Sequence, residues 1–447
     1  MKDQELFERI VTSLFDEFEK RSISFCVLRN YQRLPQANIG TDIDILVNNN
    51  GHKKSHEVLS GIAKKYNLKI FQVLKDPGSS IFRLHKALLR NRFFLQVDIS
   101  TDKQYYGALY LAAEQILEKR NLFRNFYIPD PVHESLACWL PPFLYGGSIK
   151  EKNKKFIKDT VEKHKELFLK ELSNILGKKL NHKVFPLLLK GKWGNIEKYR
   201  FRIRLSVFTF ALFRRPIYFL SHFSQLLSKS LRYRLFPPGA LVVLLGPDGS
   251  GKTTIAEKTF RILKSNYRSD KSCLMHWRPG ILPQLSEVFS RLRLKREKDE
   301  NFKNPHRAKT VGFLSSLFRL SYYSFDFIWG YFSRVRPKLY RGMLVIFDRY
   351  YYDFIVDPRR SRINLSSFFP QVFIKFLPHP DAVIYLDNEP EILSKRKQEL
   401  PLEELKRQVR SYRNLISKIP NGYIVKGNRP VENIINEVTD IILNAKL

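Results

Sequence analysis

Cysteine is nearly absent from this sequence. Among 447 residues only Cys26, Cys138 and Cys273 occur, far apart and in no paired spacing. This scarcity argues against a disulfide framework and against a zinc site, and it is typical of proteins of a reducing compartment. We therefore expect a cytoplasmic protein.

Long apolar runs are missing as well. No stretch of about 18 apolar residues occurs, so we expect no membrane-spanning helix. Charged side chains also interrupt the N-terminus, which argues against a signal peptide, and Leu6, Ile10, Leu14 and Phe18 have helical spacing. The composition, 43% apolar and 13% aromatic, is enough to bury cores, and the length is typical of roughly three domains.

Acidic residues are few compared with basic ones, and the formal net charge is +35. Residues 150–236 carry 22 lysines and arginines against six acids. This excess indicates nucleic acid, an anionic membrane surface or phosphorylated substrates as partners, or simply solvated lysines. Because the sequence has no recognition helix, RNA-binding aromatic signature or zinc module, nucleic acid is disfavoured.

The first 105 residues are typical of a small α/β domain. Short buried strands are expected at 23–29, 43–47 and 93–99, with helical patterns between and before them. Residues 106–236 follow as a helical, basic extension and connector. Within this extension, residues 201–236 alternate aromatic and aliphatic side chains with arginines and contain no acid. That pattern predicts either a helix lying on an anionic membrane, at its inner face, or a connector helix packed against one of the domains.

Pro237-Pro238-Gly239 ends this segment and begins the next domain, residues 240–447. Apolar runs at 240–245, 343–347 and 382–386, with a weaker one at 423–425, alternate with helical patterns. Near-continuous apolar strands separated by helices predict an α/β fold, with a parallel sheet covered by helices on both faces.

A phosphate-binding loop follows the first of these strands. Residues 246–253 read GPDGSGKT and match the pattern G-x-x-x-x-G-K-[ST], between an apolar strand and a helix. Glycines there let backbone N–H groups surround a phosphate, and the helix N-terminus favours the same anion. The pattern therefore predicts ATP bound with Mg²⁺. The residues expected to bind it are Gly246, Asp248, Gly249, Ser250, Gly251, Lys252, Thr253 and Thr254, with Lys252 on the β- and γ-phosphates and Thr253 on the metal.

A second acidic position supports this site. Leu344 to Phe347 form an apolar strand that ends in Asp348, and Arg349 follows it. In a sheet with a phosphate loop, such a carboxylate faces the phosphates and becomes a second Mg²⁺ ligand. Arg349 is expected to contact the transferred or acceptor phosphate.

Together these motifs resemble the thymidylate kinase family of nucleoside monophosphate kinases. The resemblance rests on GPDGSGKTT, on Asp348-Arg349-Tyr350, and on His276-Trp277-Arg278-Pro279-Gly280, and it covers about 200 residues after Pro238. It implies that Arg278 and Tyr350 bind the acceptor, and that Arg396 and Lys397 belong to a lid over the transferred group. The residues then expected to act in catalysis are Lys252, Asp348, Arg349 and Arg396, with Lys397 on the substrate.

The resemblance is weaker on the acceptor side, because residues 281–340 are long, basic and aromatic. The acceptor is therefore either a nucleoside monophosphate such as dTMP or a sugar or surface-glycan precursor. An alternative function is a nucleotide-gated module that binds nucleic acid or membrane.

Three acids in the first domain form a second candidate site. Asp42 and Asp44 lie two residues apart and point to one face of a strand, while Asp98 ends another strand. Two neighbouring strands would unite the three as Mg²⁺ ligands. The pattern resembles the nucleotidyltransferase fold, which implies either nucleotidyl transfer or a degenerate fold that binds a substrate or regulates. The alternative is acids at strand edges that are unrelated to this fold. The family's phosphate-holding Gly-Ser turn is absent near Arg29, and Gly40-Thr41 abuts the acids instead.

Overall fold

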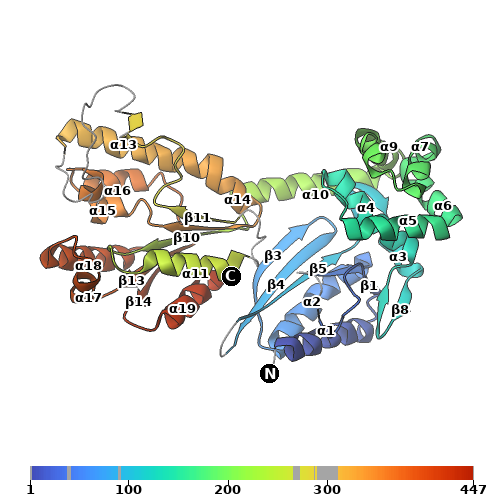
Figure 1. Cartoon of the computed structure of the whole chain (residues 1–447), viewed down its shortest axis with the longest axis horizontal. Coiled ribbons are helices and arrows are strands. Elements are labelled where there is room, and N and C mark those ends of the chain that lie inside the picture. The colour runs from blue at the N-terminus through green and yellow to red at the C-terminus, as the bar shows by residue number, and fades with distance from the viewer. Residues whose placement is uncertain are drawn as a thin grey trace. The chain divides into compact units, whose positions relative to one another are not determined.

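A computed structural model describes residues 3–37, 42–88, 92–264, 272–285, 287–288 and 311–445 (Figure 1). The chain forms two compact units, Met1–Arg232 and Tyr233–Leu447. Within the described ranges no helix is both long enough and apolar enough to cross a membrane.

The N-terminal unit begins with a five-stranded mixed sheet. Its strands are β1 (Phe25–Val27), β2 (Ile43–Val47), β3 (Lys69–Asp76), β4 (Ser79–Ala87) and β5 (Arg92–Ser100), in the order β1-β2-β5-β4-β3. Only β2 and β5 are parallel. Helices α1 (Asp3–Lys20) and α2 (Asn49–Lys65) contribute side chains to the core of this sheet, because their apolar residues recur at helical spacing. The strands expected at 43–47 and 93–99 are confirmed, and the strand expected at 23–29 is shortened to β1.

The helical pattern expected between residues 47 and 93 corresponds to α2, but β3 and β4 form an antiparallel hairpin in the same stretch that was not expected. Two further hairpins lie at the start of the stretch expected to be helical, residues 106–236, and the first strand of the first hairpin precedes it. They are β6 (Lys103–Tyr105) with β7 (Ala108–Leu111), and β8 (Asn121–Phe123) with β9 (Phe126–Ile128), separated by α3 (Ala113–Glu118). Strands of three or four residues are too short for a period of two to stand out from a helical pattern.

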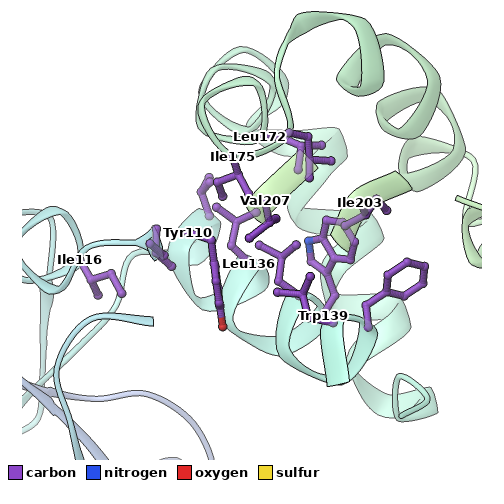
Figure 2. Close-up of a cluster of buried hydrophobic side chains, with 14 of the residues drawn as sticks. Tyr110, Ile116, Leu136, Trp139, Leu172, Ile175, Ile203 and Val207 are labelled. Atoms are coloured by element: carbon purple, nitrogen blue, oxygen red, sulfur yellow. The ribbon is translucent and has the colours of Figure 1, made fainter. Parts of the chain in front are cut away.

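A bundle of helices completes this unit. Its members are α4 (Pro131–Tyr145), α5 (Glu151–Lys163), α6 (Lys165–Leu176), α7 (Lys178–Leu189), α8 (Trp193–Glu197), α9 (Arg200–Arg214) and α10 (Pro216–Leu235). Figure 2 shows their shared core, in which Trp139 and Leu136 of α4 lie beside Ile203 and Val207 of α9. The predicted helix over 201–236 is two helices, since Pro216 has no N–H to continue α9.

The C-terminal unit is built on a five-stranded parallel sheet. Its strands are β10 (Ala240–Leu245), β11 (Cys273–His276), β12 (Leu344–Asp348), β13 (Ala382–Asp387) and β14 (Gly422–Lys426), in the order β11-β12-β10-β13-β14. The predicted parallel sheet is confirmed. The first strand of the unit, β10, is central, and the chain proceeds first to one side of it and then to the other. Ligands of such sheets bind at this switch point, beyond the carboxyl ends of the strands.

Helices cover both faces of this sheet, as predicted. They are α11 (Lys252–Lys264), α13 (Phe313–Gly330), α14 (Arg336–Tyr340), α15 (Asp353–Val356), α16 (Phe368–Ile374), α17 (Pro390–Arg396), α18 (Leu402–Ile416) and α19 (Val431–Asn444), with a π-helical turn (Tyr331–Val335) between α13 and α14 and a 3₁₀ turn (Pro358–Ser361). In Figure 1, α11 and α19 lie on one face and α13 on the other. Alternate residues of β10, such as Leu241 and Val243, pack with Leu320 and Phe327 of α13.

Candidate active site

The loop between β10 and α11 has the backbone conformation that its glycines predict. Gly249 and Gly251 have φ values of +83° and +84°, which other residues adopt only with strain. A Cβ atom on Gly249 would lie 3.3 Å from the Cβ of Lys397, whereas one on Gly251 would meet nothing within 4 Å. Lys252 begins α11, so the positive end of this helix adjoins the loop.

Lys252 is buried behind the loop. Its side chain is 6% exposed, and its Nζ donates to the carbonyl of Pro247 at 3.0 Å and lies 3.7 Å from Asp248 Oδ1. Burial, followed by the charge of Arg349, lowers the pKa of Lys252 to about 8. A buried ammonium of this kind is stabilised by an anion brought close to it. The arrangement suits a phosphate-binding lysine.

Asp348 closes the base of the loop from the neighbouring strand. Parallel pairing sets it opposite Leu244 of β10 and His276 of β11. Thr253 Oγ1 donates to Asp348 Oδ2 at 2.6 Å, and His276 Nδ1 lies 3.0 Å from the same oxygen. Burial alone would raise the pKa of this carboxyl, but the hydrogen bonds from His276 and Thr253 lower it.

The other oxygen of Asp348 makes this corner suitable for a cation. Asp348 is 1% exposed, and its Oδ1 is buried without a hydrogen-bond partner in the described part of the chain. A buried carboxylate oxygen of this kind is costly unless something pairs with it. Asp348 Oδ1 and Thr253 Oγ1 are hard oxygen donors, which Mg²⁺ prefers. The residues expected to hold the metal therefore fit it.

Arg349 links the phosphate loop to the helices of the next segment. Its guanidinium donates to Asp353 Oδ2 at 2.7 Å and to Asp248 Oδ1 in the loop. Arg360 donates to the second oxygen of Asp248. Burial would raise the pKa of Asp248, but the charges of Arg349, Lys252 and Arg360 hold it well below its usual range. Asp248 is therefore ionised and held by cations on two sides.

Arg278 lies in a separate corner of the unit. It donates to Asp326 Oδ2 of α13 at 3.1 Å, and its side chain is 9% exposed. The carboxylate of Asp326, which is fully buried, also accepts the backbone N–H groups of residues 280–282 at 2.7–3.2 Å. Arg278 is thus positioned by α13, a helix within the segment where the sequence departs from the family pattern.

Tyr350 lies in the hydrophobic core. It is 3% exposed, packs against Phe327 and Phe347, and donates its hydroxyl to the carbonyl of Pro378 at 3.2 Å. This position corrects the expectation that Tyr350 binds the acceptor. The buried stretch that begins with β12 extends past Asp348 to Tyr350, so this side chain packs in the core next to the site.

The expected lid residues lie at the end of α17. Arg396 and Lys397 approach the phosphate loop, because a Cβ on Gly249 would lie 3.7 Å from the Cβ of Arg396 and 3.3 Å from that of Lys397. Lys397 also pairs with Glu399 at 3.1 Å. Of the remaining loop residues, Thr254 is exposed on the first turn of α11 and Ser250 is buried.

Several residues of this site had not been identified from the sequence. His276 had a detectable signal, because it ends a strand beside the one that carries Asp348. Asn388 follows β13, and its amide lies 3.4 Å from the carbonyl of Ser250. Tyr412 of α18 donates its hydroxyl to Asp353 Oδ1 at 2.9 Å. Arg360 and Tyr412 reach the site from distant turns and helices, and no local pattern marks them.

The three acids of the N-terminal unit also meet. Asp44 of β2 is paired in register with Asp98 of β5, and one oxygen from each of Asp42, Asp44 and Asp98 lies within 4.8 Å of the others. Burial, then the charges of Asp44 and Asp42, raises the pKa of Asp98 to about 7. Crowded carboxylates of this kind favour either a shared proton or a cation.

Basic side chains surround this acidic cluster. Arg29 donates to Asp44, with Nη2 at 3.1 Å from Oδ1, and lies 3.6 Å from Asp42. Lys103 lies close enough for Asp44 and Asp98 to act on its charge, and burial lowers its pKa. Gly40-Thr41, the pair that abuts the acids in the sequence, lies outside the described residues.

Comparison with known proteins identifies the C-terminal unit. Residues 245–438 match the family model of thymidylate kinase. The chain is 27% identical over 212 residues to a probable thymidylate kinase of Staphylothermus marinus, covering 46% of this chain and 95% of that protein. It is 27% identical over 222 residues to a thymidylate kinase of Clostridium novyi, covering 45% and 96%. A thymidylate kinase structure from Ehrlichia chaffeensis aligns at 18% identity and a TM-score of 0.33, over 46% of this chain and 99% of that one.

The expected resemblance is thereby confirmed for this part of the chain. Residues 245–438 are a thymidylate kinase-like domain, and the protein is an enzyme of the nucleotide kinase type. The matched residues include the phosphate loop, Arg278 and Asp348-Arg349.

Proposed function

We propose that the thymidylate kinase-like domain transfers the γ-phosphoryl group of ATP to a nucleoside monophosphate, with dTMP as the first candidate. The observation that carries this proposal is that Lys252, Thr253 and Asp348 lie together at the carboxyl ends of the adjacent parallel strands β10 and β12. An acceptor phosphate attacks the γ-phosphorus, the bond from that phosphorus to the β,γ-bridging oxygen breaks, and ADP leaves. A phosphate dianion carries its own electron pair, so this attack needs no general base.

The chain's residues then act by position and charge. Lys252 and the N–H groups of the loop bind the β- and γ-phosphates. Thr253 and Asp348 would hold Mg²⁺, which would neutralise charge on the phosphates. Arg349, fixed by Asp353, carries a positive charge to the loop. Arg396 and Lys397, beside Gly249, neutralise charge that develops on the transferred group.

The acceptor is expected beyond the carboxyl end of β11, where Arg278 lies. Arg278, held by Asp326, is the proposed contact for the acceptor phosphate. What supports this contact is that Asp326 of α13 holds the guanidinium of Arg278 in a fixed position. A sugar phosphate or surface-glycan precursor offers the same anionic group, and a panel of acceptors distinguishes these sources.

The test measures label transfer from γ-labelled ATP to nucleoside monophosphates and to sugars and sugar phosphates. We expect a labelled diphosphate with one or more nucleoside monophosphates, and loss of transfer by at least about 10²-fold in Lys252→Ala. Lys258→Ala, an exposed lysine on the same helix, is the matched control and should retain activity. Absence of transfer to every acceptor, with ATP bound normally, would support a nucleotide-gated binding module instead.

A second activity is proposed for the N-terminal unit, because the geometry of Asp42, Asp44 and Asp98 favours it. Three carboxylates on adjacent strands are a donor set for Mg²⁺ in nucleotidyl transfer. That reaction releases pyrophosphate and moves the α-phosphorus, so only α-labelled ATP would report it. Asp44→Asn should abolish such transfer, while Asp16→Asn, an exposed acid on α1, should not. No incorporation of α-label would favour a degenerate binding site.

A further inference from the structure

Helix α10 has two apolar faces, and within the described residues only one of them is packed. On the packed face, Phe219 and Tyr233 are 5% and 9% exposed. Phe219 lies against Phe208 of α9 with ring centroids 4.9 Å apart, and Tyr218 donates its hydroxyl to Asp102 at 2.9 Å. A Cβ on Gly107, between β6 and β7, would lie 3.1 Å from the backbone nitrogen of Phe223. These contacts fix the orientation of α10.

The opposite face presents a row of exposed aliphatic side chains. At 100° per residue they share one stripe, about 27 Å long at 1.5 Å per residue. We name this row the α10 stripe. Its members, each 58–83% exposed, are Ile217, Leu220, Leu227, Leu231 and Leu235. Ser224 and Ser228 lie between them, and no charged residue interrupts the row. A contiguous apolar face of this extent marks an interaction surface.

The surroundings of the α10 stripe are basic. From Lys198 to Pro247 the sequence contains no aspartate or glutamate. Arg214 and Arg215 precede the helix, and Arg232 and Arg234 flank the stripe near its end. Long basic side chains beside an apolar row keep their charge in the headgroup layer of a bilayer while their stems cover apolar surface. Anionic headgroups would complement this charge.

Two exposed aromatic residues lie close to the ends of α10 along the chain. Phe213 is 81% exposed just before α10, and Phe236 is 75% exposed just after it. Aromatic rings favour the boundary between headgroups and acyl chains. A second copy of this chain is a poor occupant by comparison, because antiparallel pairing of two stripes would oppose Arg214 and Arg215 to Arg232 and Arg234.

We propose that α10 lies in the surface of an anionic lipid bilayer, with the α10 stripe among the acyl chains and the flanking arginines at the headgroups. The helix does not cross the bilayer. This inference is independent of the kinase reaction, since it concerns a surface of helix α10 and not the residues of the phosphate loop.

The test is sedimentation of the full chain with vesicles of phosphatidylcholine alone or with a quarter phosphatidylglycerol. We expect binding to the anionic vesicles, much weaker binding to the neutral ones, and loss of binding as salt shortens the Debye length from about 8 Å to about 3 Å. Leu227→Glu with Leu231→Glu should weaken binding at least about tenfold, because both leucines leave the acyl region.

The matched control is Ser221→Glu with Gln225→Glu, which adds the same charge to the same helix beside the stripe and leaves its aliphatic side chains in place. Both positions are exposed, so we expect both double variants to keep the helical content of the parent by circular dichroism. Equal loss of binding in the two double variants would show a charge effect alone and overturn the proposal.

Three further outcomes would also contradict it. One is no sedimentation of the parent with anionic vesicles. Another is a dimer in vesicle-free solution that the leucine pair abolishes, which would make the stripe an interface between copies. The last is loss of binding in Phe318→Glu with Phe325→Glu, exposed residues of α13, with binding retained in the leucine pair.

Discussion

Replacing Asp326 with alanine tests how the acceptor corner is built. The carboxylate is fully buried and accepts four hydrogen bonds, one from Arg278 at 3.1 Å and three from the backbone of residues 280–282 at 3.2, 2.8 and 2.7 Å. Hydrogen bonds to a charged group contribute about 1.5–3 kcal/mol each, but they are not additive here, because all share one side chain. Removing one partner of a buried ion pair costs about 3–5 kcal/mol. We therefore expect Asp326→Ala to lower the free energy of unfolding of the C-terminal unit by about 3–5 kcal/mol.

The local effect is measured by hydrogen exchange. Without their acceptor, the amides of residues 280–282 should exchange about 10- to 150-fold faster, which corresponds to about 1.5–3 kcal/mol. The control is Tyr322→Phe on the same helix, which removes one exposed hydrogen bond, from the tyrosine hydroxyl to the carbonyl of Pro283. This control should change the stability of the unit by about 0.5–1.5 kcal/mol at most.

Asp326→Ala should affect acceptor use and ATP binding differently. Asp326→Ala leaves the phosphate loop and Lys252 untouched, so the dissociation constant for ATP should stay near that of the parent. Transfer to the acceptor should fall, because Arg278 loses the partner that orients it. Unchanged exchange at residues 280–282 would refute the reasoning about the anchor. Weakened ATP binding with normal acceptor transfer would refute the division between the two corners.

Three further predictions concern the phosphate loop. Gly249→Ala should lower the free energy of unfolding more than Gly251→Ala in urea titrations. Both variants place an alanine in a left-handed conformation, at a cost of about 1–2 kcal/mol, but only Gly249→Ala brings a Cβ to 3.3 Å from the Cβ of Lys397. Equal losses in the two variants would contradict this. The folded-state pKa of Lys252, about 8, lies below its unfolded value, so above about pH 8 its amine is mostly neutral and must take up a proton from solvent when ATP binds. The calorimetric affinity for ATP should therefore fall up to about tenfold per pH unit above about 8, and a flat profile would exclude Lys252 as the contact. Thr253→Val should weaken ATP binding in Mg²⁺ more than in EDTA. Equal weakening in the two conditions would show that the Thr253 hydroxyl is not a metal ligand.

Much of the C-terminal site could be predicted from local sequence. The phosphate loop is a contiguous pattern whose glycines, lysine and threonine each have a physical reason at their position, and in the structure Lys252 contacts Pro247 and Thr253 contacts Asp348. Asp348 could be predicted because a buried strand ends at it. Tyr350 could not, since a tyrosine beside a charged pair has the same local pattern whether it faces a ligand or the core.

Other residues depend on which segments become neighbours. Arg360 reaches Asp248 across 112 residues of sequence, and Tyr412 reaches Asp353 across 59. No period or spacing encodes these pairs, because they follow from the order of strands around β10 and from the turns that leave the sheet. The same holds for Asp326, whose importance comes from the three backbone N–H groups that it accepts and not from its sequence neighbours.

The sequence by itself determined the parallel sheet, the phosphate loop and its acidic partner strand, because burial on both faces and phosphate binding each require fixed residue types at fixed spacing. It also determined that residues 201–236 are basic, apolar and free of acids. Only the tertiary structure decided that Asp42, Asp44 and Asp98 meet, that Tyr350 is buried, and that one apolar face of α10 is packed while the other is exposed among the residues that the structure describes. The physical reason is the same in each case. A side chain's neighbours depend on how strands and helices pack, and packing joins residues that lie far apart in the chain.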